Sequence, residues 1–345
     1  MSKIAILGLG ISGIIAKNYF GRDSTGYERT PLIRKNNLAV MRTDDERIGQ
    51  MLGIALQKIK VRKAVCWGGK LVQGKPSITA ANLYSLKVNG MIGDRSILTV
   101  DSNDVVDRYL FDQSEIRMPT ENCLFNHTLV SVSLPDRFLN FDMAPEIKEG
   151  TISDTGVDIK KFFSVSYGYD TCISTLPMPM LLRILKISKF DHLFNSEKIY
   201  VSRITVLPKC GAYQTIYFPE SRTPVYRATL EGSLLIIESI GYAPDKEDVE
   251  FVLHMFGMNR KHIESVFSTV EQKMGKISSL DDTVRKSILL YITNHYNIYS
   301  LGRYALWKPS VKIRQTIDDV IKIKQLISID AERRQYESKL DFVNR

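Results

Sequence analysis

The sequence has few cysteines and no pattern of metal-ligating side chains. Its four cysteines are scattered through 345 residues, and no two of them form a C-x-x-C pair. The five histidines also lack the spacing of metal ligands. A disulfide framework and a structural zinc site are therefore not expected, and we predict no bound metal.

Long apolar runs are also missing. No stretch approaches the roughly 18 consecutive apolar residues that a membrane-spanning helix needs. The apolar start of the chain is interrupted by glycines and has no cleavage-site pattern, so a secretory signal is not expected there. We therefore predict no membrane partner and a cytoplasmic location.

What is present is a long, basic chain of ordinary composition. With 345 residues it can form a large core and, we expect, two domains. Hydrophobic residues make up 44% and charged residues 25%, which is typical of a globular protein. The net charge of +9 favours anionic partners, such as a dinucleotide, a nucleotide-linked small molecule or nucleic acid. Nothing in the sequence indicates an oligomeric state.

A glycine motif near the start of the chain is the clearest functional signal. An apolar run at residues 3–7, suited to a buried parallel strand, is followed by G-x-G-x-x-G and then by an apolar helix pattern. In a dinucleotide site, the first glycine, Gly8, permits a tight turn, and Gly10 lets the pyrophosphate approach the backbone. Gly13 allows the helix to pack close to the strand.

The same motif predicts how a nucleotide is held. The N–H groups at the helix start, over Ile11, Ser12 and Gly13, favour a phosphate charge together with the helix dipole. Glu28 stands 20 residues after Gly8, where a carboxylate accepts hydrogen bonds from the adenosine ribose. The alternative is an ordinary glycine-rich turn between a strand and a helix.

Helices and then strands are expected over the next part of the chain. Helices are expected at about residues 44–52, 79–88 and 101–111, and strands at 126–134, 137–141 and 161–165. A short buried strand then ends at Pro177, before a helix from about residue 178 to 185. The first sheet regains a strand here, so the nucleotide domain is expected to be discontinuous.

The pattern changes from Lys198 onward. Four strand-like runs, separated by turn residues, predict an antiparallel sheet over residues 199–207, 212–218, 224–230 and 233–240. Helices are expected at 244–255, 262–274 and 281–295, a last short strand at 296–300, and a helix at 313–327. The charged residues 331–345 are expected to form a surface helix.

Two later segments complete a family pattern. Asp170, Ile173, Thr175 and Pro177 give D-x-x-I-x-T-x-P, and a Gly-Arg pair stands at 302–303. With the glycine motif, these segments resemble the flavoproteins of the amine oxidase and UDP-galactopyranose mutase group. In that group the Gly-Arg segment lies against the flavin, so the resemblance implies FAD as the cofactor.

The resemblance also implies further cofactor contacts. A middle strand at 127–132, which includes Leu129, would lie against the adenosine. Arg29-Thr30-Pro31 replaces the family's Gly-Gly-Arg loop, which leaves Arg42 as the nearest candidate for a flavin or phosphate contact. The predicted cofactor-binding set is Gly8, Gly10, Ile11, Ser12, Gly13, Glu28, Arg29, Arg42, Leu129, Thr175, Pro177, Gly302 and Arg303.

The sequence does not identify the catalytic residues, but it offers three candidates. Tyr226 and Arg227 stand in a segment that looks like the mutase substrate sheet, where a Tyr/Arg pair meets sugar-nucleotide phosphates; the alternative is an outward-facing arginine. Trp307 follows the Gly-Arg pair and either stacks on a ring or belongs to the core. FAD itself would carry the chemistry, and the protein would supply position and electrostatics.

These patterns predict an α/β fold with a discontinuous, Rossmann-type FAD-binding domain and a mixed-sheet plus helical substrate domain. The expected boundaries are 1–75, 120–185 and 296–330 for the FAD-binding domain, 76–119 and 186–295 for the substrate domain, and 331–345 for a charged tail. We predict an oxidoreductase that acts on an amine, a similar small donor or a modified base. The alternatives are a non-redox sugar-nucleotide mutase or isomerase, a nucleic-acid-modifying flavoprotein and an NAD(P)-dependent dehydrogenase.

Overall fold

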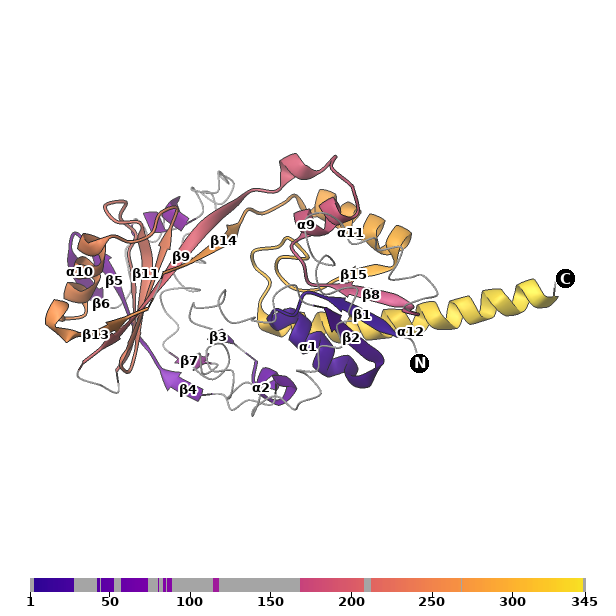
Figure 1. The fold of residues 1–345 in the computed structure, drawn as a ribbon, viewed down its shortest axis with the longest axis horizontal. Helices are drawn as coiled ribbons and strands as arrows, with labels where there is room; N and C mark the ends of the chain where they lie inside the picture. The colour runs from indigo at the N-terminus through magenta and orange to yellow at the C-terminus, as the bar shows by residue number, and fades with distance from the viewer. Residues whose placement is uncertain are drawn as a thin grey trace.

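The fold consists of a parallel sheet between helices, a large mixed sheet and a long C-terminal helix (Figure 1). The computed structural model describes the backbone of residues 3–27, 42–43, 45–52, 57–73, 80, 83–84, 86–88, 114–117, 168–207, 212–267 and 269–343. Two long strands, β9 (Ser196–Val206) and β14 (Val270–Ile277), extend from the large sheet toward the parallel one.

Four short strands from three distant parts of the chain form the parallel sheet. Its order is β15 (Ile298–Ser300), β8 (Thr171–Ser174), β1 (Ile4–Leu7) and β2 (Ser24–Tyr27), and every neighbouring pair is parallel. β1 and β8 are buried along their whole length, which matches their apolar or small side chains. The predicted return of the chain to this sheet is confirmed.

Alternate side chains of β1 face two helical layers. Ile4 and Ile6 pack with α1 (Ile11–Phe20) and α12 (Ile313–Val343). Ala5 and Leu7 point the other way, toward α9 (Met178–Ile184) and α11 (Asp282–Tyr296). Helices therefore cover both faces of the parallel sheet, as its fully buried strands require.

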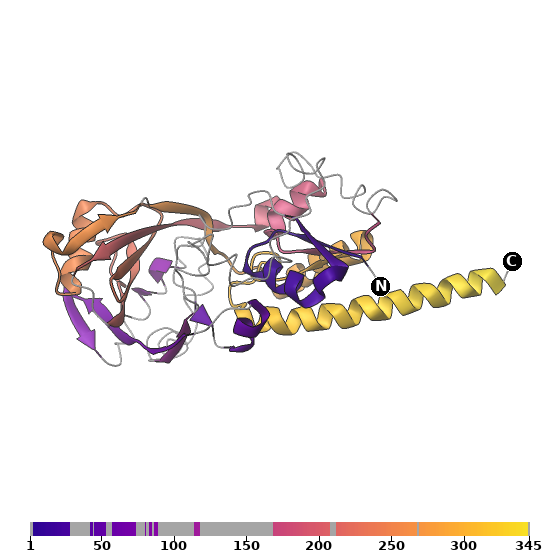
Figure 2. The ribbon, with the colours of Figure 1, turned by 60° about the horizontal axis from the view of Figure 1, so that its bottom comes forward.

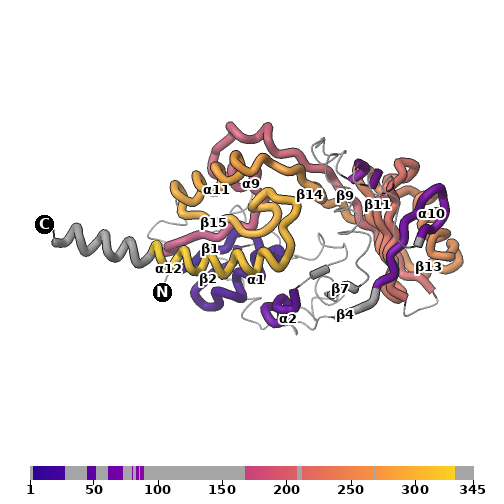
Figure 3. Tube along the Cα trace, turned by 180° about the vertical axis from the view of Figure 1, so that it is seen from behind, coloured from indigo at the N-terminus to yellow at the C-terminus, as the bar shows by residue number. Residues whose placement is uncertain are grey.

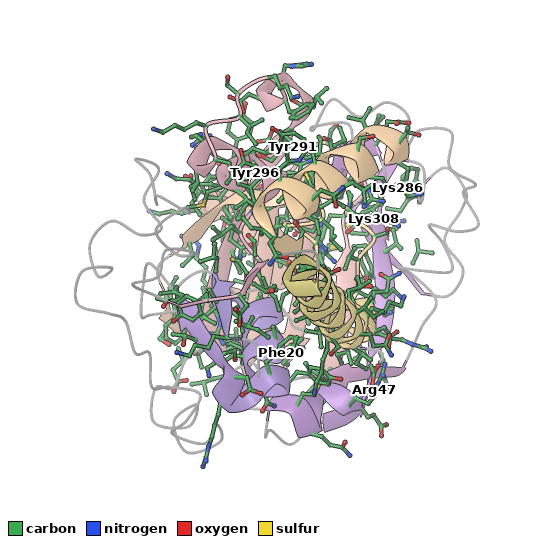
Figure 4. All side chains as sticks on the ribbon, turned by 90° about the vertical axis from the view of Figure 1, so that its right-hand side faces the viewer. Phe20, Arg47, Lys286, Tyr291, Tyr296 and Lys308 are labelled. Carbon is green, nitrogen blue, oxygen red and sulfur yellow. The ribbon has the colours of Figure 1, made fainter. Side chains whose placement is uncertain are left out.

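A short helix, α2 (Arg47–Leu52), joins the layer of α1 and α12. Arg47 donates to Asp318 of α12 at 2.8 Å and also pairs with Asp45. Figure 4 looks toward the end of α12 and shows Arg47 and Phe20 on one side of it and Tyr291 on the other. α12 has 31 residues, about 46 Å at 1.5 Å per residue, and extends past the parallel sheet (Figure 2).

The large sheet is mixed. Its order is β13 (Ile263–Val266), β9, β12 (Leu234–Ile240), β11 (Val225–Glu231), β10 (Tyr213–Tyr217), β5 (Arg62–Trp67) and β6 (Lys70–Gln73), and β14 also pairs with β9. The predicted antiparallel arrangement of β9 to β12 is confirmed, and β5 adds to β10 in parallel.

Each face of the large sheet has its own cover. α10 (Lys246–Met255), which starts with a capping box at Asp245, packs on the outer face. The described helical residues among 80–88 pack on the inner face, which turns toward the parallel sheet (Figures 1 and 3). A separate antiparallel sheet contains β3 (Arg42–Thr43), β7 (Ser114–Arg117) and β4 (Gln57–Lys60).

The predicted helix over residues 262–274 is wrong. The chain forms β13 and β14 there, and both pair with the long strand β9. Exposure alternates from Val270 to Met274, as in a strand. The backbone hydrogen bonds that this run forms with β9 outweigh its helix propensity. Gly275 permits the close crossing, because a Cβ there would lie 2.2 Å from Ile199 Cγ1.

Two predicted domain assignments also differ from the structure. Residues 62–73, placed by the sequence in the FAD-binding domain, form β5 and β6 of the large sheet. α11, placed in the substrate domain, packs on the parallel sheet through Ile288 and Ile292. An apolar pattern shows that a strand or helix has a buried face, but it does not name the element on which that face packs.

Some predicted elements lie outside the described residues, namely the helix at 101–111 and the strands at 126–134, 137–141 and 161–165. The helix predicted at 79–88 agrees with the helical backbone at residues 80, 83–84 and 86–88. Within the described ranges, no helix is both long and apolar enough to cross a membrane.

Candidate functional site

The turn between β1 and α1 has the geometry that the glycine motif predicts. Gly8 has φ +83°, in the left-handed region, and its N–H donates to Tyr27 O at 2.8 Å. A Cβ on Gly13 would lie only 2.0 Å from Gly8 O, because α1 packs against the turn at backbone distance. Both positions therefore require glycine.

Gly10 differs from these two glycines because the space beside it is open. A Cβ on Gly10 would meet nothing within 4 Å. Its φ of −62° and ψ of −178° suit any residue. The fold itself does not require glycine at this position. Open space beside the second glycine is what the close approach of a pyrophosphate would use.

The start of α1 is suited to an anion. Its N-cap is Gly10, which has no side chain to accept from the helix, and the first turn contains no acidic residue. The first N–H groups of a helix have no intrahelical acceptor, and the helix dipole adds partial positive charge there. The N–H groups over Ile11, Ser12 and Gly13 can therefore receive a phosphate.

The C-terminal Gly-Arg segment reaches this same helix start. Gly302 has φ +89°, and a Cβ on it would lie 2.2 Å from Ser12 Oγ. Two residues later, Tyr304 O accepts from Met178 N at 3.0 Å. The turn after β15 thus joins the N-termini of α1 and α9, at the carboxyl ends of the parallel strands.

Thr175 and Pro177 shape the turn from the β8 side. The N–H of Thr175 donates to Leu7 O at 2.8 Å, and its hydroxyl donates to Gly8 O at 2.7 Å. Pro177 is the N-cap residue of α9. These contacts are architectural, and direct contact of either residue with a cofactor stays a prediction.

The remaining predicted cofactor contacts are less defined. Arg303 is exposed, and its Nη2 donates to Val311 O at 3.3 Å, so it binds its own loop. Arg42 begins β3, whereas Glu28, Arg29 and Leu129 lie outside the described residues. Among the described side chains, no group of three His, Cys, Asp or Glu residues could hold a metal ion.

The large sheet carries a buried polar cluster on β11 and β12. Val225 pairs with Ser239 and Arg227 pairs with Glu238, so Tyr226 is an extra residue in a bulge of β11. Successive residues of a regular strand point to opposite faces. The bulge instead lets Tyr226 and Arg227 reach the same carboxylate.

The polar cluster is fully hydrogen-bonded around Glu238. Arg227 Nη2 donates to Glu238 Oε1 at 2.7 Å and its Nε donates to Oε2, while Tyr226 OH donates to Oε1 at 3.1 Å. Tyr226 and Glu238 are each 1% exposed. Burial raises the pKa of Tyr226 well above its usual value. Burial opposes the charge of Arg227, but Glu238 outweighs it and raises the pKa of Arg227. The phenol stays protonated and the guanidinium stays charged.

Two residues of this region are missing from the predicted site. Glu238 was detectable, because it is the single acid in the strand LLIIESI, whose seven residues are all buried, and a buried carboxylate requires a partner. Lys87 has no comparable signal, because its partners lie more than 100 residues later in the chain and the sequence does not show that the two segments meet. It donates to Phe218 O, at 2.9 Å, in the chain that leads to the bulge.

Trp307 lies in the core of the parallel-sheet layer, away from the polar cluster. It is 1% exposed and packs edge-to-face on Phe194, with ring centroids 5.1 Å apart. Its φ is +46°, and its Nε1 has no hydrogen-bond partner among the residues that the structure describes. This position supports the packing interpretation of Trp307 rather than the catalytic one.

Comparison with solved structures identifies the class of fold. The structure is similar to that of reduced UDP-galactopyranose mutase over 94% of both chains, with a TM-score of 0.64 and 16% identity. It is also similar to a CLA-producing fatty acid isomerase from P. acnes, with a TM-score of 0.52 and 13% identity over 93% of this chain and 98% of the isomerase. For putrescine oxidase the TM-score is 0.51, with 9% identity over 94% of this chain and 99% of the oxidase.

The chain therefore has a fold of the class to which reduced UDP-galactopyranose mutase and putrescine oxidase belong. The resemblance predicted from the glycine motif and the two later segments is confirmed at the level of the fold. No family model matches the sequence, and no curated protein matches it either. The likeness is thus one of tertiary structure.

Proposed function

We propose that this chain is an FAD-dependent enzyme. The observation that carries the proposal is the start of α1, where open space beside Gly10 adjoins a helix N-terminus without a capping side chain or an acid. A dinucleotide pyrophosphate needs both features, and the fold is one that flavoproteins use. Bound FAD would supply the electron-transfer chemistry, and the chain would bind and orient it.

In this proposal, three separated segments of a discontinuous Rossmann-type domain hold the cofactor. The backbone over residues 11–13 donates to the pyrophosphate. Glu28 accepts from the adenosine ribose, and the turn at Gly302 and Arg303 lies beside the phosphates or the flavin. The close packing of Gly302 on Ser12 supports this placement, because it brings the C-terminal turn to the same helix start.

We propose oxidoreductase chemistry on an amine or a similar small donor as the first candidate. The face of the large sheet that carries Tyr226 and Arg227 turns toward the parallel sheet (Figure 3). The charge of Arg227 is already compensated by Glu238. Tyr226 and Glu238 are each 1% exposed, so Arg227, 15% exposed, is the member of the polar cluster that a substrate would meet. Its compensated charge suits a small polar donor better than a pyrophosphate.

A non-redox reaction on a sugar nucleotide is the second candidate. The TM-score of 0.64 with UDP-galactopyranose mutase exceeds the 0.51 with putrescine oxidase, and this favours it. In that case Tyr226 and Arg227 would contact the phosphates of the substrate, and the ion pair of Arg227 with Glu238 would have to share its donors with them.

The test is the absorption spectrum of the purified protein between about 350 and 500 nm, before and after candidate substrates. A flavin spectrum supports both candidates. Bleaching by an amine under anaerobic conditions, without another reductant, selects the oxidoreductase. Activity on a sugar nucleotide only after reduction of the flavin selects the second candidate. A colourless protein that binds NAD would overturn the proposal.

A further inference from the structure

Lys87 occupies an unusual position on the inner face of the large sheet. It belongs to the helical residues among 80–88, whose Tyr84 and Val88 are buried against the sheet. Its Nζ donates to three backbone carbonyls: Phe218 O at 2.9 Å, Glu220 O at 2.7 Å and Val225 O at 2.6 Å. An ammonium group has three N–H donors, so all of them are used within one loop.

This loop, residues 218–225, leads directly into the bulge. Val225, whose carbonyl Lys87 holds, precedes Tyr226, and the N–H of Phe218 donates to Tyr226 O at 3.0 Å. One helical turn before Lys87, the ring of Tyr84 packs edge-to-face on Tyr217, with centroids 5.3 Å apart. Lys87 and Tyr84 thus hold both ends of the connection that carries the bulge.

Lys87 is the inner of two anchors of the loop. On the outer side, Arg222 lies over the ring of Phe251, 3.9 Å from its centroid, and Glu220 accepts from Gly68 N at 3.1 Å. The outer anchor fixes the tip of the loop to α10 and to the β5–β6 turn. Of these two anchors, Lys87 is the one that contacts Val225, the residue next to the bulge.

We propose that Lys87 is a positioning residue: through the three carbonyls it sets the bulge that directs Tyr226 and Arg227 toward Glu238. The inference rests on the proposed function in one respect, namely that the polar cluster on β11 and β12 faces the substrate. The hydrogen bonds between Lys87 and the loop form in the protein without any ligand.

Burial opposes the charge of Lys87 and lowers its pKa from the usual 10.5 to about 7. The three carbonyls oppose this shift, because only the ammonium form can donate to all of them. Among the described residues, the charged or titratable groups that face Lys87 are Glu220 and Arg222 of the loop, Asp248 of α10 and Cys66 of β5.

The experiment is hydrogen exchange measured by mass spectrometry at about pH 7, with β12 as the internal reference. Lys87→Met should lower the protection of residues 218–228 at least about tenfold relative to that of β12. Lys70→Met, at an exposed lysine of β6, is the matched control and should leave this protection unchanged.

A third variant tests the hydrogen bonds themselves. Lys87→Arg keeps a cation and donors to the carbonyls, so part of the protection should return. Equal protection in the wild type and in Lys87→Met would overturn the inference. The measurement needs no flavin, so a protein that fails to bind FAD would sink the proposed function and leave this result standing.

Discussion

Gly302 packs directly on Ser12: a Cβ on Gly302 would lie 2.2 Å from Oγ and 2.8 Å from Cβ of Ser12. The contact brings the turn after β15, the last strand of the chain, to the first helix. It places the C-terminal turn at the N–H groups where a phosphate is expected. The geometry of the proposed cofactor site therefore depends on a contact between the two ends of the sequence.

Replacing Gly302 by alanine should destabilise the protein by at least about 2 kcal/mol, because the new methyl group meets Ser12 and the φ of +89° is strained for any L side chain. Urea unfolding measures the change. Adding Ser12→Gly removes the overlap and should restore about 1 kcal/mol of the loss. A double variant no more stable than Gly302→Ala would contradict this contact.

Gly10→Ala should separate folding from cofactor binding. The space beside Gly10 accepts a methyl group, so the free energy of unfolding should change by less than about 0.5 kcal/mol. The same methyl group would occupy the approach of the pyrophosphate, so FAD affinity should fall at least about tenfold. Flavin titration followed by fluorescence measures the affinity. Gly13→Ala is the contrast, since its Cβ would lie 2.0 Å from Gly8 O and should disrupt the fold.

Breaking the buried ion pair in the polar cluster should be costly. Arg227→Met leaves the carboxylate of Glu238, 1% exposed, without its cation, and should cost about 3–5 kcal/mol. Arg227→Met combined with Glu238→Leu should recover most of this loss, as measured by denaturant unfolding. Arg62→Met, at an exposed arginine of β5, is the control, expected within about 0.5 kcal/mol of the wild type.

Stability should fall in acid partly through Asp45. Its hydrogen bond with Arg47 lowers the pKa of Asp45 below the usual 3.8, although burial opposes the shift. A carboxylate with a lowered pKa stabilises the folded state above about pH 4 and loses this contribution as the pH falls through the folded-state pKa. Urea unfolding between about pH 6 and pH 3 should show a shallower decline in Asp45→Asn, by about 1 kcal/mol. Asp191→Asn, at an exposed aspartate, should follow the wild type.

A nucleic-acid partner is the remaining prediction from the net charge of +9. If it is correct, fluorescence anisotropy should show binding of a labelled oligonucleotide at low salt, with an affinity that falls steeply as salt is added. Heparin-resistant or salt-independent binding would point to another mechanism. No binding at low salt would remove nucleic acid from the possible partners.

The sequence predicted a local structure correctly where a position requires one residue type for a single physical reason. Gly8 and Gly13 must be glycine because of a positive φ and a backbone contact, and the sequence motif already implied both. The antiparallel run of β9 to β12 was predicted from four strand-like runs separated by turn residues. The helix predicted at residues 262–274 was wrong because helix propensity depends on neighbouring residues, whereas the strands that form there are stabilised by pairing with the distant strand β9.

The sequence by itself determined the strand–turn–helix of a dinucleotide site, the short buried strand before Pro177 and the α/β class, because each depends on neighbouring residues. Only the tertiary structure decided which distant groups meet: Gly302 on Ser12, Glu238 with the two residues of a bulge, and Lys87 with three carbonyls of one loop. These contacts depend on strand register and on one inserted residue. A register or a bulge is settled by packing between elements, and no local pattern encodes it.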